Sequence, residues 1–122
     1  MGRPFVHLHL HSHYSLLCGA IHFKSLFPKL QEMGMDTVAV TDRSQMFGAV
    51  DFQIKCKKNG IKPIFGTELL YLHELTSNEE SAHLVVLGTN EQGYQSLRHL
   101  SSRSYLEGQK RDVPHIDWEM LR

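Results

Sequence analysis

The chain has 122 residues, of which 41% are hydrophobic, so it has the size of one small domain or of part of a larger one. Its 13 Lys and Arg residues balance its 13 Asp and Glu residues, which excludes a global basic field for nucleic-acid binding but leaves room for a local basic face. No apolar run approaches the ~20 residues of a membrane span and the N-terminus lacks a signal-peptide core, so we expect a cytoplasmic protein with no membrane partner.

Histidines occupy alternate positions near the N-terminus, at His7, His9, His11 and His13. Residues 5–10 are expected to form a strand, which would turn neighbouring imidazoles to one face about 7 Å apart, close enough for two to share a metal ion. The outer pair would lie roughly 20 Å apart, so one metal cannot use all four. Alternating histidines can also form a polar strand face. The pattern favours metal-site ancestry because five of the 9 histidines fall in the first 22 residues.

A first helix is expected after this strand, capped by Ser25 and ending at Gly34. Pro28 would then fall in the first turn, where its missing N–H would be unpaired anyway. The apolar side of this helix is expected to consist of Leu26, Leu30 and Met33.

The middle of the chain continues the alternation of strands and helices. Residues 37–41 are mostly β-branched and almost wholly apolar, which suits a strand of a parallel sheet covered on both faces. A helix is predicted over residues 47–58, with Asn59-Gly60 as its stop. Residues 61–72 carry one or two strands interrupted near Gly66. The buried face of the helix is expected to hold Ala49, Phe52 and Cys56.

The second half of the chain repeats the pattern. Residues 74–81 are polar and predict a loop, residues 83–87 predict a buried strand, and Asn90 is expected to cap a third helix. The inward side chains of that helix are expected to be Tyr94, Leu97 and Leu100. Strands that alternate with helices indicate an α/β fold with a parallel sheet.

The last residues predict an N-cap at Asp117 followed by one helical turn that carries Trp118 and Leu121. A stable helix needs more length or more packing than this. We therefore interpret residues 1–122 as a truncated portion of a larger domain whose continuation is missing. A frayed tail is the alternative, but it would expose both apolar side chains without a reason.

Five segments recur in the order and spacing of one known family. They are His-Leu-His-Leu-His-Ser-His-Tyr-Ser-Leu-Leu-Cys-Gly-Ala from His7, Val-Thr-Asp-Arg-Ser-Gln-Met-Phe-Gly-Ala-Val from Val40, Gly-Ile-Lys-Pro-Ile-Phe-Gly-Thr-Glu from Gly60, Asn-Glu-Gln-Gly-Tyr-Gln-Ser-Leu from Asn90 and Tyr-Leu-Glu-Gly from Tyr105. Together they resemble the PHP (polymerase and histidinol phosphatase) domain found at the N-terminus of the bacterial replicative DNA polymerase III alpha subunit. The resemblance covers essentially the whole chain.

The resemblance implies a distorted, TIM-like seven-stranded β/α barrel, of which residues 1–122 would supply about half. In the family, up to three metal ions gather at the carboxyl ends of the strands, and the active members hydrolyse phosphoesters. Alpha subunits that keep the metals link this domain to 3′→5′ proofreading, whereas in others the domain is degenerate and structural. Carried over by position, the metal ligands fall on His9, His11, Glu68 and His83.

Two ligand positions depart from the family pattern. Cys18 stands where intact members have Asp, and Arg43 stands where they have His. A thiolate can still bind zinc, so Cys18 is a candidate additional ligand. A guanidinium has no lone pair to offer and repels a divalent cation. We therefore expect weak or partial binding of Zn²⁺ or Mn²⁺, at least one missing metal, and a contact between Arg43 and the acidic ligand Glu68.

Two functional classes follow from the resemblance. The first is a degenerate PHP module with a mainly structural or interaction role in a DNA polymerase, whose partners would be DNA, replisome subunits and the rest of the polymerase chain. The second is a metal-dependent phosphoesterase, either a proofreading exonuclease or one similar to histidinol phosphatase. Cys18 and Arg43 favour the first class. The nucleotidyltransferase site and the Mg²⁺ of such a polymerase would lie outside these residues.

No catalytic residue can be assigned from the sequence. Ser12 and Ser15 lack an evident base and oxyanion hole, so we expect both hydroxyls to hydrogen-bond within their loop instead of acting as nucleophiles. Cys18 and Cys56 are too far apart for a Cys-x-x-Cys motif and would be reduced in the cytosol.

Overall fold

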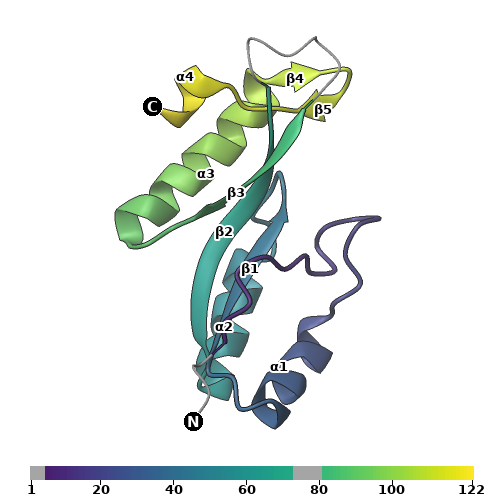
Figure 1. Ribbon diagram of the computed structural model, residues 1–122, viewed down its shortest axis with the longest axis vertical. Coiled ribbons are helices and arrows are strands. Elements are labelled where there is room, and N and C mark those ends of the chain that lie inside the picture. Colours follow the sequence, from purple (N-terminus) through teal and green to yellow (C-terminus); the bar gives the residue numbers. More distant parts are fainter. Residues whose placement is uncertain (1–4, 73–80) are drawn as a thin grey trace.

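The structure is a computed structural model that describes residues 5–72 and 81–122. Its elements alternate between helix and strand along most of the chain, as Figure 1 shows. In chain order they are α1 (Phe23–Glu32), β1 (Thr37–Arg43), α2 (Ala49–Asn59), β2 (Lys62–Tyr71), β3 (Ala82–Leu87), α3 (Glu91–Leu106), β4 (Gln109–Lys110), β5 (Val113–Pro114) and α4 (Trp118–Leu121).

The main sheet has three strands in the order β1-β2-β3 and is open in the described part of the chain. Strands β1 and β2 are parallel, but β2 and β3 are antiparallel, so the prediction of a wholly parallel sheet was wrong. The reason is connection length: residues 72–81 are the whole link between β2 and β3, whereas a parallel crossover takes a dozen or more. The loop predicted for residues 74–81 lies almost entirely outside the described residues.

Strand β3 is only partly buried, because it is the outer strand of this sheet. The prediction that residues 83–87 form a buried strand was therefore wrong in its burial, although the strand itself is present. Strand β2 runs without a break through Gly66, which resolves the predicted one or two strands into one. A Cβ at Gly66 would lie 2.6 Å from the Val86 carbonyl oxygen, so only glycine lets β3 approach this closely.

The N-terminal segment lies beside β1 but does not form the strand predicted for residues 5–10. The amide of Ala39 donates to the His7 carbonyl, and the amide of Thr41 donates to the Leu10 carbonyl, both at 2.9 Å. Three residues along the segment thus match two along β1, which is the geometry of a bulge. The amide of Leu10 donates to the Thr41 hydroxyl at 2.8 Å, so a side chain replaces the backbone partner that a regular ladder would use.

Helix α1 begins earlier than predicted. His22 is its N-cap, and the Ser25 hydroxyl donates back to the His22 carbonyl at 2.9 Å instead of capping. Phe23 is fully buried, and its packing draws the first turn into the core. Pro28 therefore lies inside the helix, not in its first turn, and Met33 is the C-cap with half of its surface exposed, not an inward residue.

The other helices agree with their sequence signals. Helix α2 ends at Gly60, whose φ of 65° is in the left-handed region that glycine tolerates. The Asn90 side chain caps α3 by accepting from the Gly93 amide at 2.8 Å, and the Asp117 side chain caps α4 by accepting from the Met120 amide at 2.9 Å. Leu97 and Leu100 are buried as predicted, as are Ala49, Phe52 and Cys56.

The core consists of two clusters of apolar side chains. The larger one joins α1, α2, β1 and the N-terminal segment around Phe23, Phe27 and Phe52. The smaller one joins β2, α3 and the chain before α4 around Leu69, Leu100 and Ile116. Strand β2 is central to the sheet and packs against both clusters, the larger through Phe65 and the smaller through Leu69, which fixes the position of Glu68.

Candidate metal centre

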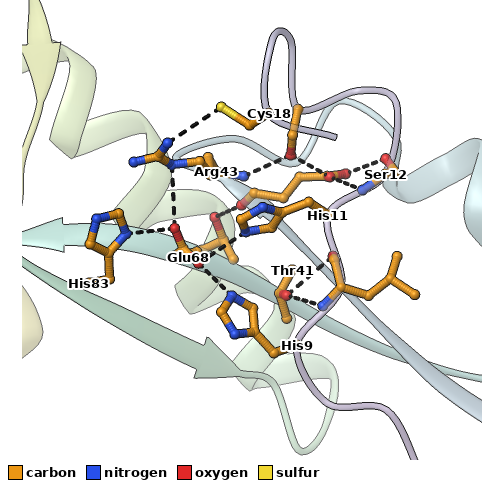
Figure 2. A network of polar contacts seen from close by, with 12 residues as sticks. His9, His11, Ser12, Cys18, Thr41, Arg43, Glu68 and His83 are labelled. Carbon is orange, nitrogen blue, oxygen red and sulfur yellow. Dashed lines mark hydrogen bonds and ion pairs between the residues drawn. The ribbon is translucent and has the colours of Figure 1, made fainter. Parts of the chain in front are cut away.

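Glu68 is the centre of a polar cluster near the carboxyl end of β2. Its side chain is only 5% exposed, and both carboxylate oxygens accept from histidines. Oε2 is in contact with Nε2 of His9 and with Nε2 of His11, the latter at 3.0 Å. Oε1 lies 2.7 Å from Nδ1 of His83 on β3 (Figure 2). The structure therefore brings together the four residues that the family resemblance selected, and their role as metal ligands remains a prediction.

The pKa of Glu68 is lowered in this setting. Burial alone would raise it, and burial is the largest single influence. Hydrogen bonds from His83 and His9, together with the charge and hydrogen bond of His11, outweigh that effect. Glu68 is therefore an ionised carboxylate at neutral pH, ready to bind a cation.

Arg43 already places a cation against this carboxylate. Its Nε lies 3.3 Å from Glu68 Oε1, which confirms the predicted contact between the two residues. The contact follows from the sheet, because Arg43 and Glu68 are directly paired in the parallel register of β1 and β2. Arg43 Nη1 also lies 3.4 Å from the sulfur of Cys18, a free and exposed cysteine. Figure 2 shows the guanidinium between Cys18 and Glu68.

Asp42 holds the loop that carries Cys18, a role that the sequence analysis missed. Its buried carboxylate accepts from the Ser12 amide at 2.7 Å, from the Ser12 hydroxyl at 2.8 Å and from the Ser15 hydroxyl at 2.6 Å. The prediction that both serine hydroxyls bond within their loop was therefore wrong in the partner, because both donate to Asp42 on β1. An acidic residue directly after the apolar run of β1 was the available signal, because polar residues at strand ends tend to line sites.

The four alternate histidines are used in three different ways. His9 and His11 meet at Glu68, whereas His13 stacks on His22 with ring centroids 4.6 Å apart and an interplanar angle of 27°. His7 makes an edge contact with Phe5 at a centroid distance of 4.8 Å. The structure thus agrees with the expectation that the series does not serve a single metal ion.

The residues fit one transition-metal ion better than a cluster. Among the described residues, the candidate group is His9, His11 and Glu68, whose ligand atoms all lie within 4.8 Å of one another. Two imidazoles and one carboxylate form a donor set that zinc and manganese accept. On the other side of the carboxylate, His83 and Cys18 share their space with the Arg43 guanidinium, which cannot ligate.

Comparison with known proteins decides the family. The sequence profile of the PHP domain matches residues 7–122. The chain belongs to the PHP domain family. It is similar to DNA polymerase III subunit alpha of Helicobacter pylori strain J99, with 46% identity over 126 residues that cover 99% of this chain and 10% of the relative. The corresponding subunit of Campylobacter jejuni is 50% identical over 109 residues, which cover 85% of this chain and 9% of the relative.

This PHP chain spans about a tenth of the length of the curated relatives it matches. Among solved structures, it is similar to a protein assigned as a metal-dependent phosphoesterase from Bifidobacterium adolescentis, with a TM-score of 0.60, 17% identity and coverage of 85% of this chain and 35% of that one. An amidohydrolase from Chromobacterium violaceum gives a TM-score of 0.56 and 20% identity, over 80% of this chain and 34% of that one. These two likenesses show the fold.

No helix in the described parts of this PHP chain is long and apolar enough to cross a membrane.

Proposed function

We propose that this PHP chain is a portion of a replicative DNA polymerase III alpha subunit and that its metal site is degenerate, with a mainly structural or interaction role. Identities of 46% and 50% to alpha subunits of two bacteria support the parentage. The partners would be DNA, replisome subunits and the rest of the polymerase chain, in the cytoplasm. The polymerase reaction and its Mg²⁺ would belong to parts of that protein outside these residues.

The position of Arg43 is the main observation in support of a degenerate metal site. In a multi-metal centre, both oxygens of a bridging carboxylate face cations. Here Oε2 of Glu68 faces His9 and His11, but Oε1 faces a guanidinium at 3.3 Å. The arginine is thus a covalently attached replacement for one cation, and it repels a divalent ion from that side.

The remaining side would hold one weakly bound Zn²⁺ or Mn²⁺ through His9, His11 and Glu68. Cys18, the further candidate ligand, lies on the other side against Arg43 and would have to move to reach this ion. When bound, such an ion would supply Lewis-acid polarisation of a phosphate oxygen. The protein residues would orient it, since the buried Glu68 is held by its contacts to His83 and Arg43. Because the site offers only three ligand atoms and lies next to the Arg43 guanidinium, we expect its affinity for the metal ion to be weak.

For the fold, we propose that residues 1–122 are the N-terminal half of a PHP barrel. The open three-stranded sheet with helices and the likeness to two proteins, of which this chain covers 35% and 34%, support this proposal. In such a barrel, the outer edge of β3 would pair with a further strand.

The alternative is a working phosphoesterase, either a 3′→5′ proofreading exonuclease or one similar to histidinol phosphatase. The fold likeness to a metal-dependent phosphoesterase favours it, and so does the convergence of three histidines on Glu68. The arginine in a ligand position disfavours it.

Elemental analysis of the untagged chain, combined with hydrolysis of a phosphodiester substrate in excess Mn²⁺, separates the two. We expect less than one metal per chain and no hydrolysis above the level of a His9→Ala, His11→Ala double variant. Two or more tightly held metals per chain, or hydrolysis that this double variant abolishes, would favour the phosphoesterase and end the degenerate assignment.

A further inference from the structure

Without a metal ion, the negative charge of Glu68 is balanced by the positive charge of Arg43, and a bound metal ion would disturb this balance. The carboxylate is then paired with the Arg43 guanidinium, whose Nε lies 3.3 Å from Oε1. A divalent ion on the Oε2 side would take over much of the carboxylate's charge. Because Arg43 is covalently attached and packed against Cys18, it would remain close by as an undercompensated cation.

The guanidinium also has a free side that solvent can reach. Its Nε contacts Glu68 and its Nη1 contacts Cys18, while Nη2 has no partner among the residues that the structure describes. The Arg43 side chain is 36% exposed, whereas Glu68 is buried beneath it. An anion from solution can therefore approach Nη2 without displacing either contact.

We infer that Arg43 is a metal-dependent clamp for a phosphate group. An oxyanion that contacts both the ion and the guanidinium relieves their mutual repulsion, so metal and anion bind with positive coupling. The inference rests on the proposed single metal at His9, His11 and Glu68. Arg43 thereby has two effects on metal affinity. It lowers the affinity for the metal ion alone, and it raises the affinity when the anion binds together with the metal ion.

The charge and shape of the site favour phosphate over other anions. A divalent ion, one guanidinium and one carboxylate leave two positive charges, which a phosphate dianion neutralises and a single carboxylate does not. Nη2 carries two N–H groups, which can donate to phosphate oxygens while Nε and Nη1 keep their contacts. The ligand is thus a terminal phosphate group, whether free or at the end of a nucleotide.

The experiment measures Mn²⁺ affinity by the electron paramagnetic resonance signal of free Mn²⁺, with and without inorganic phosphate. Four proteins are compared: the unmodified chain, Arg43→Gln, Arg43→Lys, and Arg98→Gln as a control on the exposed face of α3. Mn²⁺ also binds phosphate in solution, but that effect is the same for all four proteins. The ratio of the phosphate effects between proteins therefore isolates Arg43.

We expect phosphate to tighten Mn²⁺ binding about tenfold in the unmodified chain and in Arg98→Gln, within the range usual for coupled sites. Arg43→Gln should bind Mn²⁺ more tightly without phosphate and lose at least two thirds of the phosphate effect, and Arg43→Lys should fall between. Circular dichroism establishes that each variant is folded. The same measurement with a nucleoside 3′-monophosphate in place of phosphate distinguishes two ligands. If both anions tighten Mn²⁺ binding equally, the ligand is free phosphate; if the nucleotide tightens it more, the ligand is the phosphate at a nucleotide end.

Two outcomes overturn the inference, and they differ in what they leave standing. If Arg43→Gln shows the same phosphate effect as the unmodified chain, Arg43 is no clamp, but the metal site and the proposed function survive. If none of the four proteins binds Mn²⁺ even in the presence of phosphate, Arg43 is no metal-dependent clamp and the site has a structural role only. Two tight metals per chain would instead contradict the proposed function itself.

Discussion

Arg43 Nη1 lies 3.4 Å from the sulfur of Cys18, so the two residues that depart from the PHP ligand pattern contact each other. Their adjacency is a product of the fold, because Cys18 lies on the loop that Asp42 anchors and Arg43 follows Asp42 at the end of β1. A guanidinium beside a sulfur is a stable polar contact, whereas beside the Asp of the family pattern it would form an ion pair. The two residues that depart from the family pattern therefore occupy the same part of the site, next to Glu68.

Arg43→His should raise the affinity for Zn²⁺ or Mn²⁺ by about tenfold or more. The change removes a like charge, whose repulsion of a unit cation at ~4 Å is about 4 kcal/mol at an effective dielectric of ~20, and it adds an imidazole ligand. Isothermal titration of the metal-free chain measures the effect, with Arg98→His as the matched control. An unchanged affinity would mean that Arg43 does not limit metal binding.

Glu68→Gln should lower the free energy of unfolding by about 1–3 kcal/mol at pH 7, because Arg43 and three histidines lose a charged acceptor. The folded-state pKa of Glu68 is lowered, so its stabilising contribution is present above the ordinary value of 4.5 and is lost as the pH falls through the lower folded-state pKa. The stability difference between the two proteins should therefore shrink below pH 4.5.

Urea unfolding at several pH values measures this difference. The control is Glu32→Gln, since Glu32 forms an exposed pair with Lys29 and should change stability by less than about 1 kcal/mol. A stability difference between the unmodified chain and Glu68→Gln that widens as the pH falls below 4.5 would show that the direction assigned to the Glu68 pKa shift is wrong.

Asp42→Asn should destabilise the chain by about 1–3 kcal/mol and weaken metal binding. The amide keeps one acceptor oxygen but turns N–H groups toward the donors of Ser12 and Ser15, which leaves buried groups unpaired. The loop next to His11 would then lose its anchor. Chemical unfolding and metal titration test this, with exposed Asp36→Asn as the control. Equal stability of the two variants would contradict the anchoring role.

Gly66→Ala should destabilise the chain by about 1–3 kcal/mol, since the added Cβ would overlap the Val86 carbonyl oxygen at 2.6 Å and a Leu87 methyl at 2.6 Å. Gly93→Ala is the comparator, because its nearest contact is 3.2 Å and alanine favours helix α3, so its effect should stay under about 1 kcal/mol. Thermal unfolding decides between them. A tolerated alanine at position 66 would mean that β2 and β3 can separate.

The isolated 122-residue chain should be marginally stable and should dimerise or aggregate. Strand β3 is an outer strand of the described sheet, and large apolar side chains such as Leu17, Phe47 and Trp118 are exposed. Analytical ultracentrifugation and thermal unfolding measure both properties. A monomer with one sharp transition would show that these residues are self-sufficient.

Several helix ends could be predicted from the sequence because they depend on interactions between residues close together in the chain. The Asn90 and Asp117 caps and the stop at Gly60 depend on hydrogen bonds or backbone angles within a few residues, so the residue types alone predicted them. The meeting of Arg43 with Glu68 was predictable from the family resemblance and the attraction of opposite charges.

Contacts between distant segments decided the rest. Burial of Phe23 moved the start of α1 away from Ser25, and the short link after β2 turned β3 antiparallel, which places His83 opposite Leu70 and within reach of Glu68. The anchoring role of Asp42 exists because β1 brings it under the serines of the N-terminal loop. Residue patterns reveal which side chains can cap or ligate, but packing and strand register decide which of them meet, because those depend on groups far apart along the chain.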